Sequence, residues 1–375
     1  MIYLIGGLLA SAFMTLYRAT PHRSSPLWTL TLGSSTLTSR LHGKGDKVSN
    51  SFALLISFSI LFFIAGLRYG IGTDYWARYA PLFTQIKQSE VQGQEIGYVL
   101  LNKAVGLATD DYQGIFVVTS FLTIALFYRF FVRMSVNPGL SVFIYVFGGT
   151  YLADFNLVKQ GLAVAIVVNT FELALRRKNL AFVLMTLLAA SFHTSALIWF
   201  AVWPLMWIRV SRAWRIAIAL AMIGVILVVP QILSALITRF APSYGWYFDS
   251  NYGVTRSIQP VVVVVAVLVF IFCLLVIGKA GEKDRYADSS VNILAVSAAV
   301  LVATSTIAYL FNRLNYYFEP AQLIALPLAL SLVQNRLARQ VMTLLFMIAY
   351  LLSFIFQFLV WNAHGVLPYD SIFSR

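Results

Sequence analysis

The residues of this sequence best suited to chemistry are charged and polar side chains that border long apolar runs. The first group follows the apolar run that ends at Leu67, and it comprises Arg68, Asp74, Tyr75, Arg78 and Tyr79. An arginine fork suits phosphate oxygens, a carboxylate can accept a hydroxyl proton, and tyrosine rings can stack on sugar faces. Two glycines, Gly70 and Gly72, permit the tight loop that would gather these groups. An ion pair between Arg68 and Asp74 that only orders the loop, with interfacial tyrosines, is the alternative.

Three further groups have the same character. Lys159 and Gln160 begin another apolar run, although Lys159 could simply extend its charge to the membrane surface. Arg313, Tyr316 and Tyr317 lie on a short link between two runs, where a belt of interfacial aromatics explains the tyrosines but not the arginine. The segment 238–259 carries Arg239 and Arg256 among aromatic residues, which suits a carbohydrate or a loop lying on headgroups.

A histidine is singled out by the length of the segment that contains it. Residues 179–208 form an apolar stretch of 30 residues, too long for one membrane-spanning helix and short for two. Two helices of about 14 residues reach only about 21 Å each, less than the ~30 Å apolar core of a bilayer. The turn at residues 191–195 should therefore lie below the outer surface, where irregular backbone must be buried or face a wet cavity. We expect His193 to face such a cavity.

The elements that position these groups are membrane helices. The composition is 60% hydrophobic and 11% charged, which leaves too little polar surface for a soluble fold. Near-continuous apolar runs exclude a closed barrel, whose strands alternate polar and apolar residues. The sequence predicts an all-α, polytopic helical bundle forming a single domain, residues 1–375, with about twelve spans near 1–17, 51–67, 113–131, 139–153, 160–175, 179–192, 194–208, 214–237, 258–278, 290–310, 320–334 and 341–361.

The distribution of charge orients these spans. Of the 27 basic residues, 18 fall in one set of alternate loops together with five acidic residues, whereas the other loops carry nine of each. This excess indicates cytoplasmic loops, among them the basic loop 18–50, and outside loops at 68–111 and 238–259. Both termini are expected outside, and residues 1–17 are interpreted as a retained first span. The net charge of +13 thus reflects topology and excludes nucleic-acid binding as its explanation.

Familiar cofactor and metal motifs are absent from the sequence. It contains no Walker A sequence, no HExxH and no glycine-rich dinucleotide fingerprint, and no residues at metal-ligand spacing. Its single cysteine, Cys273, cannot form an internal disulfide. We therefore expect no cofactor and no metal.

Several segments, taken in order, resemble the EpsG/Wzy-like family of exopolysaccharide and O-antigen polymerases. They are LRYGIGTDYWARY (67–79), EIGYVLLN (95–102), NLVKQGLAVAI (156–166), the basic turn RRKNLAF, ASFHTSALI (190–198), NRLNYYFEP (312–320) and LPYDSIF (367–373). The resemblance implies a GT-C-like glycosyltransferase at the outer face of the bacterial cytoplasmic membrane. Such an enzyme transfers a growing glycan from polyprenyl pyrophosphate to the next lipid-linked repeat. Lys159 departs from the family pattern, which more often has arginine there, and lysine offers a point charge instead of a fork.

The resemblance also implies roles for the residues described above. Arg68 and Arg313, helped by Lys159 or Arg256, would bind the pyrophosphate leaving group. Either Asp74, which its place on an outside loop favours, or His193 would be the base for the acceptor hydroxyl. Direct displacement would invert the anomeric centre without a metal. The other expected substrate-binding residues are Tyr75, Arg78, Tyr79, Gln160, Arg239, Tyr316 and Tyr317. Expected partners are the lipid-linked donor and acceptor, membrane lipid, a chain-length regulator and an exporter.

Three other functions are compatible with a protein of about twelve spans. A lipid-linked oligosaccharide flippase or other transporter should place its charges near the bilayer midplane, often with internal repeats, and no convincing repeat is found. Another membrane acyl- or glycosyl-transferase is the second alternative, but an acyltransferase would need its histidine or aspartate to face a cytoplasmic thioester. A structural scaffold is the third.

Overall fold

Most of the residues that the structure describes are helical. The computed structural model describes residues 1–17, 44–88, 93–207, 211, 213–221, 223–224, 228, 260–280, 284–304 and 312–375. Within these ranges the only extended pairing is one antiparallel bridge between Arg68 and Ser371. The contacts divide the chain into a first unit, Met1–Phe200 with Tyr350–Arg375, and a second unit, Ala201–Ala349.

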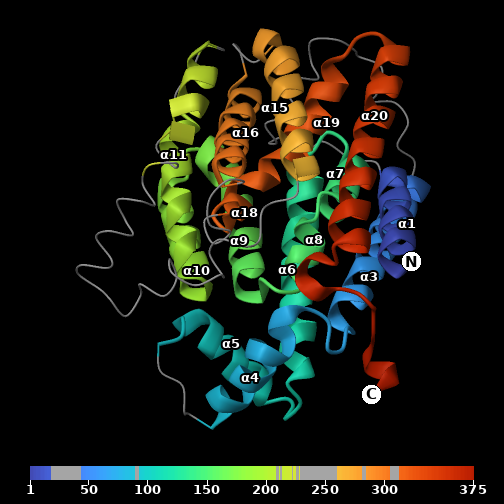
Figure 1. The fold of residues 1–375 in the computed structure, drawn as a ribbon, viewed down its shortest axis with the longest axis vertical. Helices are drawn as coiled ribbons and strands as arrows, with labels where there is room; N and C mark the ends of the chain where they lie inside the picture. The colour runs from blue at the N-terminus through green and yellow to red at the C-terminus, as the bar shows by residue number, and fades with distance from the viewer. Residues whose placement is uncertain are drawn as a thin grey trace. The chain divides into compact units, whose positions relative to one another are not determined.

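The first unit is a row of packed helices (Figure 1). Helix α1 packs against α3 and α7, α3 packs against α6, α6 against α9, and α9 against α10. Its elements are α1 (Ile2–Leu16), α3 (Lys44–Gly66), η1 (Tyr75–Tyr79), α4 (Ala80–Lys87), α5 (Ile96–Gly106), α6 (Gln113–Met134), α7 (Pro138–Phe147), α8 (Thr150–Ala153), α9 (Val158–Leu175), α10 (Asn179–Phe192) and η2 (Thr194–Ala201), whose last residue belongs to the second unit. The end of α20 (Arg336–Phe354) and the short helices η6 (Ile355–Val360), η7 (Ala363–Gly365) and η8 (Ile372–Ser374) complete it.

The second unit is built around α15, which packs against α16 and α19. Its described elements are α11 (Val202–Leu205), α15 (Pro260–Ala280), α16 (Arg285–Thr304), α18 (Asn315–Phe318), η5 (Glu319–Ala321), α19 (Gln322–Leu332) and most of α20. Arg215 is buried here, where it pairs with Asp288 and donates from Nε to Asn292 Oδ1 at 2.7 Å. Such pairing is what a charge needs when it leaves water.

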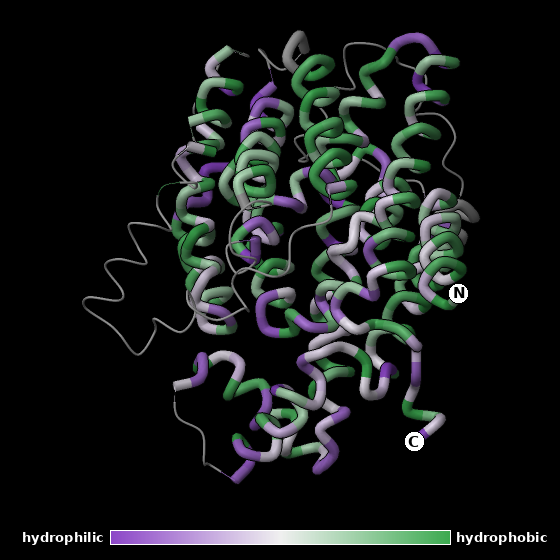
Figure 2. The backbone as a smooth tube through the Cα atoms, viewed as in Figure 1, coloured by the Kyte–Doolittle hydropathy of each residue, from purple (hydrophilic) through white to green (hydrophobic). Residues whose placement is uncertain are grey.

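The hydropathy of the helices confirms an all-α integral membrane protein. Five described helices are long and apolar enough to cross a bilayer, and they are Gln113–Met134, Val158–Leu175, Pro260–Ile277, Arg285–Ala303 and Arg336–Val360. Shorter apolar helices cover Ile2–Leu16, Asn50–Gly66, Pro138–Phe147, Asn179–Phe192 and Thr194–Leu205. Figure 2 shows α15 as almost uniformly hydrophobic, whereas the α4–α5 region mixes hydrophilic and hydrophobic residues.

One of the predicted spans is interrupted, and another differs slightly from its predicted bounds. The predicted span 139–153 ends as a helix at Phe147, because Gly149 adopts a left-handed conformation (φ 100°) before the short helix α8 begins. At 1.5 Å per residue, α7 alone covers about 15 Å. Within the predicted span 320–334, the α-helix covers only Gln322–Leu332 and contains Pro327. The predicted span 214–237 lies mostly outside the described residues.

The predicted reversal of the chain around residues 191–195 is confirmed. Helix α10 ends at Phe192, and His193 is in extended conformation. Six residues later the indole of Trp199 donates a hydrogen bond of 2.7 Å to Thr170 Oγ1, in the second half of α9. Phe200 likewise contacts Phe182, near the start of α10. The chain after His193 therefore runs back along α9 and α10.

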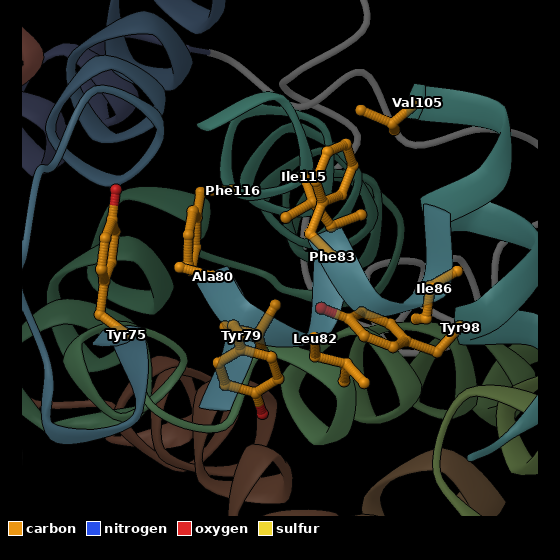
Figure 3. Close-up of a cluster of buried hydrophobic side chains, with 11 residues drawn as sticks. Tyr75, Tyr79, Ala80, Leu82, Phe83, Ile86, Tyr98, Val105, Ile115 and Phe116 are labelled. Carbon is orange, nitrogen blue, oxygen red and sulfur yellow. The ribbon is translucent and has the colours of Figure 1, made fainter. Parts of the chain in front are cut away.

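The predicted outside loop 68–111 is largely helical. Helices η1, α4 and α5 pack with the start of α6 around a core of Tyr75, Tyr79, Phe83, Tyr98 and Phe116 (Figure 3). This core fixes the positions of the charged residues that border it.

Candidate functional site

Arg68 lies inside the first unit, with only 1% of its surface exposed. Its guanidinium donates to Ser120 Oγ at 3.1 Å, to the Phe155 carbonyl at 3.3 Å and to the Ala65 carbonyl. It also lies over the Phe155 ring at 4.5 Å. These contacts join the end of α3 to α6 and to the segment before α9. The alternative of an Arg68–Asp74 ion pair is wrong, because the guanidinium is committed to these other partners.

Arg68 also borders a small cavity. The cavity has a volume of about 20 Å³, and its lining includes Thr119, Tyr145 and Asp154. Such a volume suits roughly one water molecule. Asp154 accepts a hydrogen bond of 2.9 Å from the Tyr145 hydroxyl, whereas Nε of Arg68 has no hydrogen-bond partner among the described residues.

The loop that contains Gly70 and Gly72 is called the glycine loop below, and Asp74 is half-buried at its end. Its backbone N–H donates to Asn156 Oδ1 at 3.3 Å, and Asn156 Nδ2 donates to the His364 carbonyl at 2.8 Å. Gly72 has φ of 102°, and a Cβ there would lie 2.5 Å from Asn156 Oδ1, so the close approach depends on glycine. The loop is thus held by Asn156 on one side and by the segment 362–375 on the other.

The tyrosines of the same motif point into the core. Tyr75 is fully buried and stacks on Phe116 with ring centroids 4.1 Å apart (Figure 3). Its hydroxyl donates to Gln113 Oε1 at 2.6 Å. Tyr79 is 3% exposed, in the same core. Arg78 is exposed, and so is Trp76, which the sequence analysis did not select.

A cluster of three charged or titratable side chains lies where α5, α9 and α10 meet. Lys159 Nζ is 2.6 Å from Glu95 Oε2, and Glu95 Oε1 is 3.0 Å from His193 Nδ1. The side chains of Lys159, Glu95 and His193 are 2%, 18% and 27% exposed, so the histidine is the most accessible member. We call these three residues the Lys–Glu–His cluster. Gln160, next to Lys159, is also buried.

The electrostatics of the cluster keep its acid ionised. Burial alone would raise the pKa of Glu95, but hydrogen bonds from His193 and Lys159 outweigh it and lower that pKa to about 2. The interpretation that Lys159 merely reaches toward solvent is wrong, because its ammonium is buried against Glu95 and also donates to Gln94 Oε1 at 3.0 Å.

Glu95 begins the motif EIGYVLLN but was not among the predicted site residues. It occupies the position before the first residue of α5, whose Gly97 lies directly against α10: a Cβ at Gly97 would be 2.3 Å from Ser191 Oγ. This glycine contact brings Glu95 within reach of His193. The sequence signal was a carboxylate that directly precedes an apolar helix.

The remaining predicted site residues are not part of the first unit. Arg313 and Tyr316 are half-buried and Tyr317 is fully buried, all within the second unit, where Ser297 donates to Asn315 Oδ1 at 2.8 Å. Arg239 and Arg256 lie outside the described residues. Among the residues that the structure describes, no group of three or more His, Cys, Asp or Glu side chains is placed to hold a metal ion.

Comparison with known protein families identifies a family for this chain. A family model described as the EpsG family matches residues 51–371. The matched range contains the glycine loop, the Lys–Glu–His cluster and most of the segment 362–375. No curated protein and no solved structure matches the chain.

Proposed function

Because this chain belongs to the EpsG family, we propose that it is a membrane glycosyltransferase that polymerises polyprenyl-pyrophosphate-linked oligosaccharide repeats. The product would be exopolysaccharide, capsule or O-antigen, made at the outer face of the bacterial cytoplasmic membrane. The proposal includes a GT-C-like bundle of twelve spans with its site facing outside. Such a substrate combines three parts. Its lipid tail needs an apolar groove, its diphosphate needs cations, and its sugar needs a polar vestibule.

The observation that carries the proposal is the Lys–Glu–His cluster. A carboxylate bound to Nδ1 of His193 holds that nitrogen as the N–H donor and leaves Nε2 as a proton acceptor. This is the arrangement of a general base whose orientation is fixed by a third group. The Asp74 carboxylate accepts a long hydrogen bond of 3.4 Å from its neighbour Thr73, which orients it less firmly than Glu95 orients His193, so we favour His193 over Asp74 as the base. Lys159 neutralises Glu95 and keeps it in place.

The reaction would be a direct displacement at the anomeric carbon of the donor. The acceptor hydroxyl oxygen attacks that carbon, its proton passes to His193 Nε2, and the bond from carbon to the diphosphate oxygen breaks. The electron pair leaves on the diphosphate, and the anomeric centre is inverted. Positive charge near the departing oxygen stabilises this transition state.

Arg78 is exposed in the first unit, and we assign it to the leaving group for that reason. Arg313 and Arg256 stay predicted leaving-group residues, and Arg239 a predicted substrate-binding residue, on the sequence alone. Arg68 is already committed to protein partners, so we assign it to positioning the glycine loop. Tyr75 and Tyr79 would support the site through the core, and Gln160, which is also buried, would do so beside Lys159. Tyr316 and Tyr317 of the second unit stay substrate-binding predictions from the sequence alone.

The test is the size distribution of lipid-linked glycans in reconstituted vesicles at matched protein levels. Native protein should produce a ladder, and His193→Ala should accumulate single repeats on the outer leaflet. Single repeats trapped on the inner leaflet would instead make the protein a flippase. An unchanged ladder in both His193→Ala and Asp74→Ala would contradict the assignment of the base.

A further inference from the structure

An exposed group of aromatic rings lies beside Asp74. Trp76 is 49% exposed, although Tyr75 before it is fully buried. The indole meets the rings of Tyr69 and Tyr112 edge to face, at centroid distances of 5.5 and 5.6 Å. Tyr69 and Tyr112 are half-buried, so the three rings form one partly exposed patch. We call Tyr69, Trp76 and Tyr112 the aromatic patch.

Charged groups are held at the edge of this patch. The guanidinium of Arg375 lies over the Tyr69 ring at 5.3 Å and over the Tyr112 ring at 5.4 Å. Its Nη1 pairs with the Asp111 carboxylate, and both side chains remain about 40% exposed, at 41% and 40%. An arginine and a carboxylate with unused hydrogen-bonding capacity therefore border exposed aromatic rings.

The position of Arg375 depends on a chain segment that returns from far along the sequence. Tyr69 N–H donates to the Asp370 carbonyl at 3.1 Å, and Ile372 N–H donates to the Leu67 carbonyl at 3.0 Å. The hydroxyl of Tyr3 in α1 donates to the Val366 carbonyl at 2.8 Å. These bonds fix the segment 362–375 along the glycine loop, so the arginine is placed there by the fold.

We propose that the aromatic patch and Arg375 form a saccharide-binding subsite for the glycan part of the lipid-linked substrate. A pyranose ring presents a face of C–H groups with partial positive charge, which the negative face of an indole attracts. Its hydroxyl groups both donate and accept hydrogen bonds, which suits a guanidinium beside a carboxylate. Tryptophan at a membrane surface is common without any ligand, but that explanation requires neither the arginine nor its carboxylate partner.

The subsite is separate from the Lys–Glu–His cluster but joined to it through the core of Figure 3. Tyr75 stacks on Phe116. The ring centroid of Tyr79 lies 6.4 Å from that of Phe116 and 6.1 Å from that of Tyr98. Lys159 Nζ in turn lies 5.5 Å from the centroid of the Tyr98 ring. The two sites lie at opposite ends of this row of rings. The subsite would therefore hold sugars other than the reacting one, a conclusion that rests on the proposed function.

Loss of such a subsite should weaken substrate binding more than it slows the chemical step. In reconstituted vesicles we expect Trp76→Ala to raise KM for the lipid-linked repeat about tenfold, the effect of losing one good ring stack, with kcat nearly unchanged. Trp76→Phe should restore most of the affinity, and Arg375→Lys should give an intermediate KM. Trp361→Ala is the matched control, because Trp361 is 63% exposed and outside the patch.

A binding measurement separates this inference from the proposed function. The free oligosaccharide repeat, without lipid or pyrophosphate, should bind detergent-solubilised native protein and Trp361→Ala, and bind Trp76→Ala about tenfold more weakly. Equal affinity in all three proteins would overturn the subsite, as would a Trp76→Ala variant that loses kcat with KM unchanged. If native protein makes no polymer yet shows this pattern of binding, the subsite stands and the proposed function fails.

Discussion

At the scale of single residues, the central feature is a carboxylate shared by a lysine and a histidine. Glu95 uses one oxygen for Lys159 and the other for His193. Burying Lys159 without its acid would leave an uncompensated charge, which costs several kcal/mol, about 3–5 in comparable cases. Glu95 therefore stabilises the fold and orients the proposed base at the same time.

Substitution of Glu95 by glutamine should separate these two roles. Glutamine can still accept a hydrogen bond from Lys159, but its neutral oxygen stabilises a protonated histidine far less. We expect the polymerisation rate to fall by about tenfold to hundredfold, part of the roughly 10²–10⁴ that a general base supplies. The measurement is the initial rate in vesicles, with Lys103→Gln, an exposed lysine on the same helix, as the control. A rate equal to native would remove Glu95 from the mechanism.

The depressed pKa of Glu95 also predicts how stability depends on pH. The pKa falls from 4.5 to about 2 on folding, so this carboxylate contributes stability that is complete above about pH 4.5 and is lost as pH falls toward 2. The difference in Tm between native protein and Glu95→Gln should therefore be constant near neutral pH and shrink below about pH 4.5. Thermal unfolding of both proteins across that range is the measurement. A difference that grows on acidification would contradict the ionised cluster.

At the scale of elements, the contact of α5 with α10 determines whether the cluster can form. Replacing Gly97 by alanine would place a Cβ 2.3 Å from Ser191 Oγ and 2.9 Å from the Ser191 carbonyl oxygen, so backbone must move. Because Glu95 and His193 lie on either side of this contact, the shift should lengthen their 3.0 Å hydrogen bond. We expect Gly97→Ala to lower the polymerisation rate severalfold or more, in line with the sensitivity of catalysis to displacements near 1 Å.

The same helix supplies a control for that prediction. A Cβ at Gly106 would meet its nearest neighbours at 4.0 Å, an ordinary contact. Gly106→Ala should leave the rate unchanged and stabilise the helix by up to about 1 kcal/mol. Equal rates in the two alanine variants would show that the close approach at Gly97 is not needed for activity.

The sequence could predict which elements exist better than how they are used. Hydropathy and charge predicted the membrane helices, and the length of the apolar segment 179–208 predicted that the chain reverses near His193. The burial of Tyr75 could not be read from its type, because tyrosine suits both a core and a sugar site. The pairing of Glu95 with Lys159 joins residues 64 positions apart, and it depends on the close packing of α5 and α10. Trp76 was overlooked because exposure is not visible in sequence.

At the scale of the whole molecule, the two ends of α9 carry opposite kinds of charge cluster. One end holds Lys159 paired with Glu95, whereas near the other end Glu172 is 6% exposed and pairs with Arg129, Arg133 and Arg176. Eighteen residues of helix cover about 27 Å, close to the ~30 Å of a bilayer core. The net positive end is the one expected in the cytoplasm.

This polarity predicts the topology of the protein and can be tested by cysteine labelling in intact cells. The native Cys273 is buried and should give no background. Lys103 and Lys178 are both exposed, on α5 and at the start of α10. We expect a membrane-impermeant maleimide to label Lys103→Cys directly but Lys178→Cys only after permeabilisation, because the positive-inside rule predicts that the arginine-rich end of α9 faces the cytoplasm. The reverse pattern would place the Lys–Glu–His cluster inside, away from an outer-leaflet substrate, and the proposed polymerase reaction would then lack access to its acceptor.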